Sequence, residues 1–206
     1  MLKSERHVRS RFPISRTLRG VTLIELLIVV TILGILVGLV LVRYEPGIPD
    51  QLQAAGQVVV SDAAYCRSLA IANNSRYRLQ FDLSSNRYWL AHSGTNSALN
   101  SLPSSPFRVA GEASTTQTTD LSKLPMLNSP ITLAAVRKVG SSTEQDITTF
   151  EFDSLGALTQ PEQATIWLCA GSGTGRRYIS VQINPVTGIA EVGDLQVTAP
   201  PTIPGP

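Results

Sequence analysis

The chain contains few of the side chains on which most enzymatic and metal chemistry depends. Among its 206 residues there are only two histidines and two cysteines. Cys66 and Cys169 are far apart in the sequence and lack the spacing of metal ligands. Two options remain open for them, a disulfide in an oxidising compartment or two small buried hydrophobic side chains. We therefore predict no metal site.

The candidates for catalysis are equally sparse. His92 is the only histidine after residue 20, and no acid lies near it in the sequence to orient it as a general base. The glycine-rich stretch Gly171–Gly175 precedes an alternating segment, Arg176–Val181, whereas a phosphate-binding loop precedes a helix. Glu151 and Asp153 alternate with phenylalanines, as on the solvent side of a strand. We predict no catalytic residue and no enzyme activity.

The chain does have one long apolar run. From Val21 to Val42 the only charged residue is Glu25. As a helix of about 22 residues at ~1.5 Å per residue, this run is long enough for a hydrocarbon layer of about 30 Å. It is too long for the apolar core of a secretory signal, and no small-x-small cleavage site follows it. The run predicts a membrane-spanning helix within residues 21–45.

Charge is divided unequally around the start of this run. Residues 1–20 carry six basic residues and one acid, or +5, so the remainder carries +2 − 5 = −3. A basic segment directly before an apolar run places the N-terminus in the cytoplasm and the C-terminal part outside. A basic arm can also bind nucleic acid or anionic lipid. Next to a membrane run, the orienting role is favoured over nucleic acid as a partner.

An acid inside an apolar run costs roughly 2.5 to 3.5 kcal/mol on insertion scales, so Glu25 needs an explanation. One explanation is local, because Thr22 and Glu25 have the spacing of a capping box. Another comes from a resemblance. Gly20 followed by Val-Thr-Leu-Ile-Glu-Leu-Leu resembles the class III signal of type IV pilins and type II secretion pseudopilins. The resemblance implies that a prepilin peptidase cuts between Gly20 and Val21 and methylates Val21, although the family usually has phenylalanine there.

The cut would leave an amine on Val21, with an ordinary pKa of about 7.7 to 8. Pairing this amine with the carboxylate of Glu25 in a neighbouring subunit would offset part of the cost of burying either charge. Thr31, Gly34 and Gly38 lie on one face of the run. Such a small-xxx-small pattern lets helices approach closely, so we predict that this face packs against other subunits.

After the run, Pro46-Gly-Ile-Pro49 interrupts helical structure and leaves the continuity of one long helix open. Asp50 and Gln53 then indicate a cap and capping box for a second helix over about 51–73. Its apolar stripe is predicted to pack on the domain that follows: Leu52, Val59, Ala63, Cys66 and Ala70.

Beyond residue 74 the apolar period changes from helical to alternating, which predicts a β-rich domain over 74–198. We expect strands near 77–82, 88–91, 131–139, 148–153, 165–170, 177–183 and 189–192. The polar stretch 93–130 is predicted to be a long surface loop, and 199–206 a proline-rich tail. The predicted fold class is α+β, with a long N-terminal helix, membrane-spanning in its first half, packed on an antiparallel sheet.

A second, looser resemblance runs through the domain. Cys66–Ile71, Phe150–Gly156 and Tyr178–Gly188 are similar to the GspH/FimT family of minor pseudopilins and minor pilins. The resemblance implies a minor pseudopilin of a type II secretion system, without cofactors, in the inner membrane and then in a periplasmic pseudopilus. Its partners would be the prepilin peptidase, other pilin-like subunits, the inner-membrane assembly platform and membrane lipid.

Two other interpretations remain. The first is a minor type IV pilin for pilus biogenesis or DNA uptake, in which Arg176 and Arg177 would form a small basic patch. The second is a single-span membrane protein with an outward binding domain, in which Glu25 is only a cap.

Overall fold

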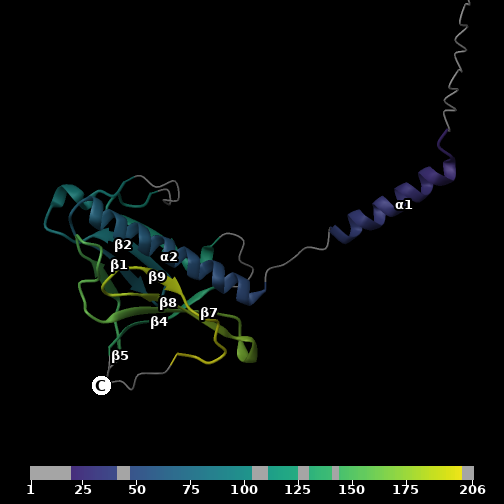
Figure 1. Cartoon of the computed structure of the whole chain (residues 1–206). Helices are drawn as coiled ribbons and strands as arrows, with labels where there is room; N and C mark the ends of the chain where they lie inside the picture. The colour runs from purple at the N-terminus through teal and green to yellow at the C-terminus, as the bar shows by residue number, and fades with distance from the viewer. Residues whose placement is uncertain (1–19, 41–46, 104–110, 125–129, 141–143, 201–206) are drawn as a thin grey trace, which may run out of the picture. The chain divides into compact units, whose positions relative to one another are not determined.

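The computed structural model describes residues 20–40, 47–103, 111–124, 130–140 and 144–200, and for residues 38–40 only the backbone (Figure 1). The chain divides into two compact units, Met1–Glu45 and Pro46–Pro206, which are described separately below.

The first unit contains helix α1, which runs from Leu23 to Val40. It lies within the predicted helical segment 21–45, and residues 41–45 of that segment fall outside the described part. Within the described part of the chain, no helix is both long enough and apolar enough to cross a membrane.

The second unit begins with helix α2, Ile48–Ala72. Its N-cap is Gly47, whose N–H donates to Oδ2 of Asp50 at 3.2 Å. The predicted start at residue 51 with Asp50 as cap is therefore wrong. Proline is tolerated in a first helical turn, where no backbone donor is needed, so Pro49 lies inside the helix and Asp50 is its third residue. The continuity of the two helices falls on residues outside the described part.

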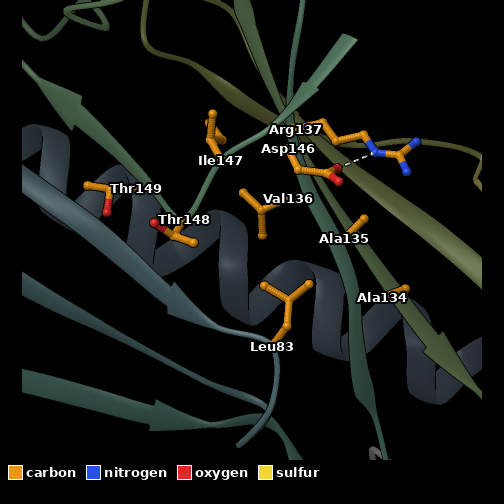
Figure 2. A pocket seen from close by; sticks show the side chains of 9 residues that line it. All are labelled: Leu83, Ala134, Ala135, Val136, Arg137, Asp146, Ile147, Thr148 and Thr149. Carbon is orange, nitrogen blue, oxygen red and sulfur yellow. Dashed lines mark hydrogen bonds and ion pairs between the residues drawn. The ribbon is translucent and has the colours of Figure 1, made fainter. Parts of the chain in front are cut away.

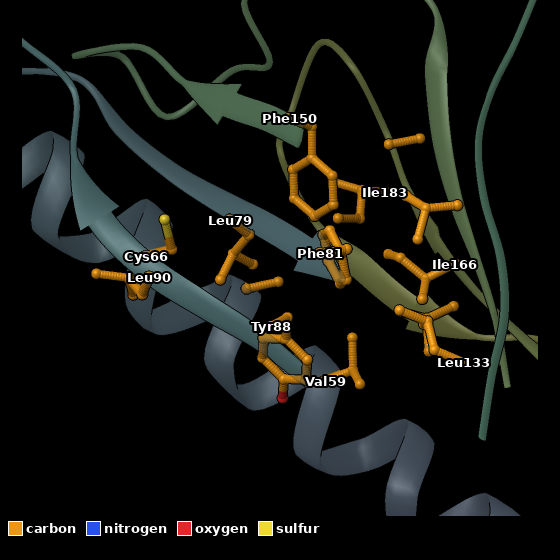
Figure 3. Close-up of a cluster of buried hydrophobic side chains, with 14 of the residues drawn as sticks. Val59, Cys66, Leu79, Phe81, Tyr88, Leu90, Leu133, Phe150, Ile166 and Ile183 are labelled. Atoms are coloured by element: carbon orange, nitrogen blue, oxygen red, sulfur yellow. The ribbon is translucent and has the colours of Figure 1, made fainter. Parts of the chain in front are cut away.

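The apolar stripe of α2 is confirmed, because all five predicted side chains are buried. Figure 3 shows Val59 of α2 beside Tyr88, and Cys66 of α2 beside Leu79 and Leu90. The helix ends at Ala72 with Asn73 as its C-cap, and Asn74 takes a left-handed conformation with φ of 45°. Such a residue is a common way to stop a helix and turn the chain, here into the first strand.

The strands form two antiparallel sheets. The first has the order β3-β2-β1-β6, with β1 Tyr77–Asp82, β2 Arg87–His92, β3 Thr116–Asp120 and β6 Thr149–Phe152. The second has the order β5-β4-β7-β8-β9, with β4 Thr132–Val139, β5 Glu144–Asp146, β7 Gln163–Ala170, β8 Arg177–Ile183 and β9 Ala190–Val192. Short 3₁₀ turns are η1 Ser97–Asn100, η2 Leu121–Lys123 and η3 Gly173–Gly175. All seven predicted strands are present, and the α+β class is confirmed.

Two strands and the division into two sheets were not predicted. β3 lies inside the stretch expected to be a surface loop, and Leu102 and Leu121 of that stretch are buried, so the prediction is wrong there. β3 is polar throughout and lies at a sheet edge, where no apolar alternation is required. β5 is held by charge instead: Arg137 Nε lies 3.0 Å from Asp146 Oδ1, and its Nη1 lies 3.3 Å from Glu144 Oε2.

The core lies between the two sheets and α2, and every residue in it belongs to the second unit. Phe81 and Phe150 stack at 5.3 Å between ring centroids, and Phe150 meets Phe152 edge-on at 5.9 Å. Figure 3 shows Phe81 and Phe150 on the side of the first sheet that faces Ile166 and Ile183 of the second sheet. Residues 46–206 therefore contain a complete core of their own.

Candidate functional site

The N-terminal end of α1 carries the predicted processing and assembly residues. Thr22 is the residue before the helix, and its Oγ1 accepts the N–H of Glu25 at 3.3 Å. Its carbonyl accepts the N–H of Leu26 at 3.1 Å, closing the first turn. Gly20 and Val21 precede the helix in exposed, irregular backbone. The bond between them is thus next to the helix start, not inside it.

Glu25 is exposed at the third position of the helix. The cap bond uses its backbone N–H, and its carboxylate has no hydrogen bond or ion pair among the described residues. The hydroxyl of Thr22 therefore caps the helix by itself, and capping does not explain why residue 25 is charged. A carboxylate in a first turn interacts favourably with the helix dipole, but this position leaves both oxygens open to a partner.

The rest of α1 presents apolar surface on all sides. Thirteen large apolar side chains from Val21 to Val37 are each between 50% and 83% exposed. Thr31 donates its hydroxyl to the carbonyl of Leu27 at 2.7 Å, so it adds no unpaired polar group. No atom lies within 4 Å of the position of a Cβ on Gly34. The surroundings of Gly38 lie outside the described part, so the packing role of this face stays a prediction.

The possible disulfide between Cys66 and Cys169 is not formed. Both cysteines are free and buried, Cys66 on α2 and Cys169 on β7. Burial, followed by the charges of Asp62 and Glu151, raises the pKa of the Cys66 thiol far above its usual range. Cys169 Sγ instead lies 2.8 Å from Thr132 Oγ1. The alternative interpretation, two small buried side chains, describes them.

His92 belongs to a hydrogen-bonded chain. Its Nε2 lies 2.7 Å from Ser75 Oγ, and its Nδ1 lies 2.8 Å from Asn100 Oδ1. The chain joins the end of α2, the end of β2 and η1, and the imidazole also packs edge-on against Tyr77. The backbone of Gly94 lies so close to the Ser75 hydroxyl that a Cβ at position 94 would be only 2.2 Å from Ser75 Oγ. The arrangement ties three elements together.

The other polar candidates also stabilise local structure. Glu151 accepts the hydroxyl of Ser93, and Asp153 Oδ1 accepts the N–H groups of Leu155 and Ala157 in a turn. The glycine-rich stretch forms η3 and leads into β8, as its alternation predicts. In the part of the chain that the structure describes, no group of three or more histidine, cysteine or acidic side chains could hold a metal.

Arg67 is a residue that pattern reasoning does not single out. Its Nε donates to the carbonyl oxygens of Gly156 at 3.1 Å and Thr187 at 2.9 Å, joining α2 to two turns. Both turns contain a left-handed glycine, Gly156 with φ of 82° and Gly188 with φ of 65°. In the sequence, an Asp or Asn followed within a few residues by glycine indicates each turn. This signal does not show that Arg67 holds the turns.

A hollow of about 550 Å³ lies where the chain crosses from one sheet to the other. Figure 2 shows the side chains that line it. Ile147 N–H donates to the carbonyl of Val136 in the second sheet, and Phe81 N–H donates to that of Thr148 from the first. The residues that line the hollow are mainly small or apolar, and its charged groups, Arg137 and Asp146, pair with each other. Such a lining carries no cluster of reactive side chains.

The described N-terminal segment is thus an exposed apolar helix that follows Gly20-Val21 and holds one acid in its first turn. Residues 16–41 match the family described as "Prokaryotic N-terminal methylation motif". This match confirms the resemblance to pilin-like proteins in the N-terminal segment, and the motif implies that a prepilin peptidase processes the chain.

Three solved structures are similar to the chain. Two are crystal forms of the type IV minor pilin FimU of Pseudomonas aeruginosa, with 16% and 17% identity, coverage of 69% and 72% of this chain and 93% and 92% of FimU, and TM-scores of 0.41 and 0.42. The third is the minor pseudopilin EpsH from the Type 2 Secretion System of Vibrio cholerae, with 12% identity, coverage of 69% of this chain and 96% of EpsH, and a TM-score of 0.45. No curated protein matches the chain. At such low identities and TM-scores, these likenesses carry no functional argument.

Proposed function

We propose that this chain is a minor pilin-like filament subunit, and more specifically a minor pseudopilin of a type II secretion system. It is cleaved between Gly20 and Val21, methylated on Val21, held in the inner membrane by its apolar run, and then moved into a periplasmic filament. The motif match at residues 16–41 supports this proposal. The observation that carries it is the exposed carboxylate of Glu25 in the first turn of an apolar helix, which has no hydrogen bond or ion pair to any residue that the structure describes.

Energies separate the role of Glu25 from that of the apolar run. Burying thirteen exposed apolar side chains in lipid, at roughly 1.5 kcal/mol or more each, contributes about 20 kcal/mol. The acid costs roughly 2.5 to 3.5 kcal/mol, which does not keep the helix out of the membrane. Pairing of Glu25 with the Val21 amine of a neighbouring subunit would remove that cost. The pairing therefore favours the assembly of subunits and fixes their register.

A role in binding DNA has less support. After residue 20 the chain carries a net charge of −3, from the overall +2 minus the +5 of residues 1–20. Arg177 Nη1 donates to the carbonyls of Thr174 and Arg176 at 2.9 Å each, so one of the two arginines holds the turn before β8. Salt-sensitive binding of DNA by residues 46–206, lost on changing Arg176 and Arg177, would favour a DNA-uptake pilin instead.

The test uses the full chain in a host with its own filament machinery, and compares Glu25→Gln with Thr22→Ala. Mass spectrometry of the membrane fraction should give an N-terminus at Val21 bearing one methyl group in both variants. Glu25→Gln leaves the Val21 amine without its charged partner, so it should reduce incorporation into the filament by at least about tenfold, from the order-of-magnitude cost of an unpaired buried charge. Thr22→Ala removes only the cap and should not reduce incorporation.

Three results would count against the proposal. An intact Met1 would favour a single-span membrane protein with an outward binding domain. Normal incorporation of Glu25→Gln would show that the charge pair is dispensable. The choice of secretion system over pilus is tested by deletion of the gene, because loss of pili with secretion intact would make the chain a minor type IV pilin.

A further inference from the structure

Two adjacent turns expose large apolar side chains at the C-terminal end of α2. Leu155, between β6 and β7, is 83% exposed, and Val186, between β8 and β9, is 80% exposed. Ile71, in the last turn of α2, is 44% exposed and touches the first of these turns, because its Cδ1 lies 2.7 Å from the position of a Cβ on Gly156. We call these three side chains the distal patch.

Both turns are closed by hydrogen bonds from backbone N–H groups to a side-chain oxygen of the turn itself. Asp153 Oδ1 accepts the N–H groups of Leu155 and Ala157 at 2.9 and 3.0 Å. Asn184 Oδ1 does the same for Val186 and Thr187, also at 2.9 and 3.0 Å. The guanidinium of Arg67 then ties the two turns to each other and to α2 through the carbonyl oxygens of Gly156 and Thr187.

The tips of the turns are thus fixed while their apolar side chains remain in water. Leu155 and Val186 contribute little to the core, so the fold gives no reason for apolar residues there. A rigid apolar tip loses little conformational entropy when another protein covers it, which is the property of a preorganised contact. Exposed apolar patches on rigid elements commonly mark interaction sites.

The position and the size of the distal patch indicate what covers it. The N-terminal segment joins α2 at Ile48, whereas the patch lies at the other end of α2, about 37 Å away for 25 residues at ~1.5 Å each (Figure 1). The three side chains expose on the order of 300 Å², well under the ~800 Å² that each partner gives to a stable two-protein interface. A partner bound by this patch alone would dissociate.

A partner that another contact already holds nearby needs no larger area, because its effective concentration is high. Within a filament, packing of the apolar N-terminal helices would be that other contact. We infer that the distal patch is a contact for the globular domain of another subunit of the same filament. That subunit would bring apolar side chains and a hydrogen-bond acceptor for the terminal nitrogens of Arg67, which have no partner among the described residues. This inference rests on the proposed function.

The experiment places a photo-crosslinking amino acid at position 155, 186 or 197 of the full chain in its own host. Val197 is a matched control, because it is an exposed valine at 72%. It follows Gln196, which pairs with Tyr178 at the start of β8, whereas Val186 follows the end of β8 at Ile183. The two positions are therefore separated by a strand length of roughly 16 Å or more.

We expect cross-links from positions 155 and 186, but not from 197, to a protein whose own N-terminus is cleaved and methylated. Val186→Asp should lower incorporation into the filament by at least tenfold while leaving cleavage at Gly20 unchanged, and Val197→Asp should leave both unchanged. Purified residues 46–206 carrying either substitution should unfold at the same temperature, since both side chains are exposed.

Equal cross-linking from position 197, cross-links only to proteins outside the filament, or normal incorporation of Val186→Asp would each overturn the inference. Failure of the proposed function is read separately in the same samples. In that case the N-terminus is not processed at Gly20, whichever position carries the cross-linker.

Discussion

Asp62 on α2 is hydrogen-bonded to two strands of the first sheet. Its Oδ2 accepts the phenol of Tyr88 at 2.6 Å and the hydroxyl of Thr119 at 2.8 Å. Tyr88 is only 1% exposed, and burial together with the charge of Asp62 raises its pKa well above the usual range. Asp62→Ala therefore removes one acceptor from two donors, one of them buried.

The magnitude follows from these contacts. Hydrogen bonds to charged groups contribute about 1.5 to 3 kcal/mol each, and a buried hydroxyl left without a partner costs about 1 to 3 kcal/mol. Asp62 is half-buried, so water reaches part of the site and the lower figures apply. We expect Asp62→Ala to lower the free energy of unfolding by about 3 kcal/mol. For a domain of this size that corresponds to a fall in Tm of about 6 to 12 °C.

The assay is urea and thermal unfolding of residues 46–206, which contain the whole core. Asp62→Asn keeps an acceptor without the charge and should cost about 1 kcal/mol. Tyr88→Phe alone should cost about 1 to 1.5 kcal/mol. The double variant Asp62→Ala/Tyr88→Phe no longer strands the buried hydroxyl of Tyr88, although that of Thr119 still loses its acceptor. Its cost should therefore fall short of the sum of the two single costs by about 1 kcal/mol or more.

Additive costs, within about 0.5 kcal/mol, would refute the reasoning, because residues that do not interact behave in that way. A loss much larger than about 3 kcal/mol with a changed urea dependence would also contradict it, since it would mean that α2 separates from the sheet.

Two further predictions concern titration and thiol chemistry. Hydrogen bonds from Ser84 and Ser85 lower the pKa of Asp82 to about 2, so the stability that this turn gains is present above the ordinary value of 3.8 and is lost as the pH falls through about 2. Asp82→Asn should therefore flatten the acid limb of the unfolding curve, and an unchanged limb would contradict this. Cys66 and Cys169 should resist iodoacetamide in the native domain at pH 8 and react with it in urea, because both are buried. A native mass lower by two hydrogens would instead reveal a disulfide.

The structure agrees with the sequence where the signal is local. The α2 stripe repeats every three to four residues, and the strands around Tyr77–Phe81 and Phe150–Phe152 alternate strictly, so each period is readable from a few neighbouring residues. The seven strands recognised in this way all have an apolar face that packs into the core.

The elements that sequence reasoning missed depend on contacts across long stretches of chain. β5 is formed by Glu144 and Asp146 against Arg137, which is a charge pairing and not an apolar pattern. β3 has no apolar face, and its place is decided by pairing with β2 and by Thr119 reaching Asp62. The division into two sheets depends on the crossing at Ile147, whose two neighbouring hydrogen bonds go to different sheets. None of these contacts has a periodic signature.

At the candidate site, the sequence predicts the residues but not the contacts that they make. A short motif predicts the roles of Gly20, Val21 and Glu25, and the structure adds that the cap of α1 uses Thr22 and not the carboxylate of Glu25. What the motif cannot give is the partner of that carboxylate, because a charge pair between subunits is not encoded within one chain. The distal patch has no motif at all, since it arises only when two turns distant in sequence meet at Arg67.

The separation of the core from α1 determines how these tests can be interpreted. All core residues belong to the second unit, from Leu52 onward, so a substitution at Glu25 removes no contact that holds the domain together. A loss of incorporation in Glu25→Gln therefore reports assembly and not misfolding. Val186 lies in the second unit, so its variant needs the comparison with Val197→Asp. If both variants fold, are processed and still fail to assemble, incorporation requires both the N-terminal charge and the distal patch.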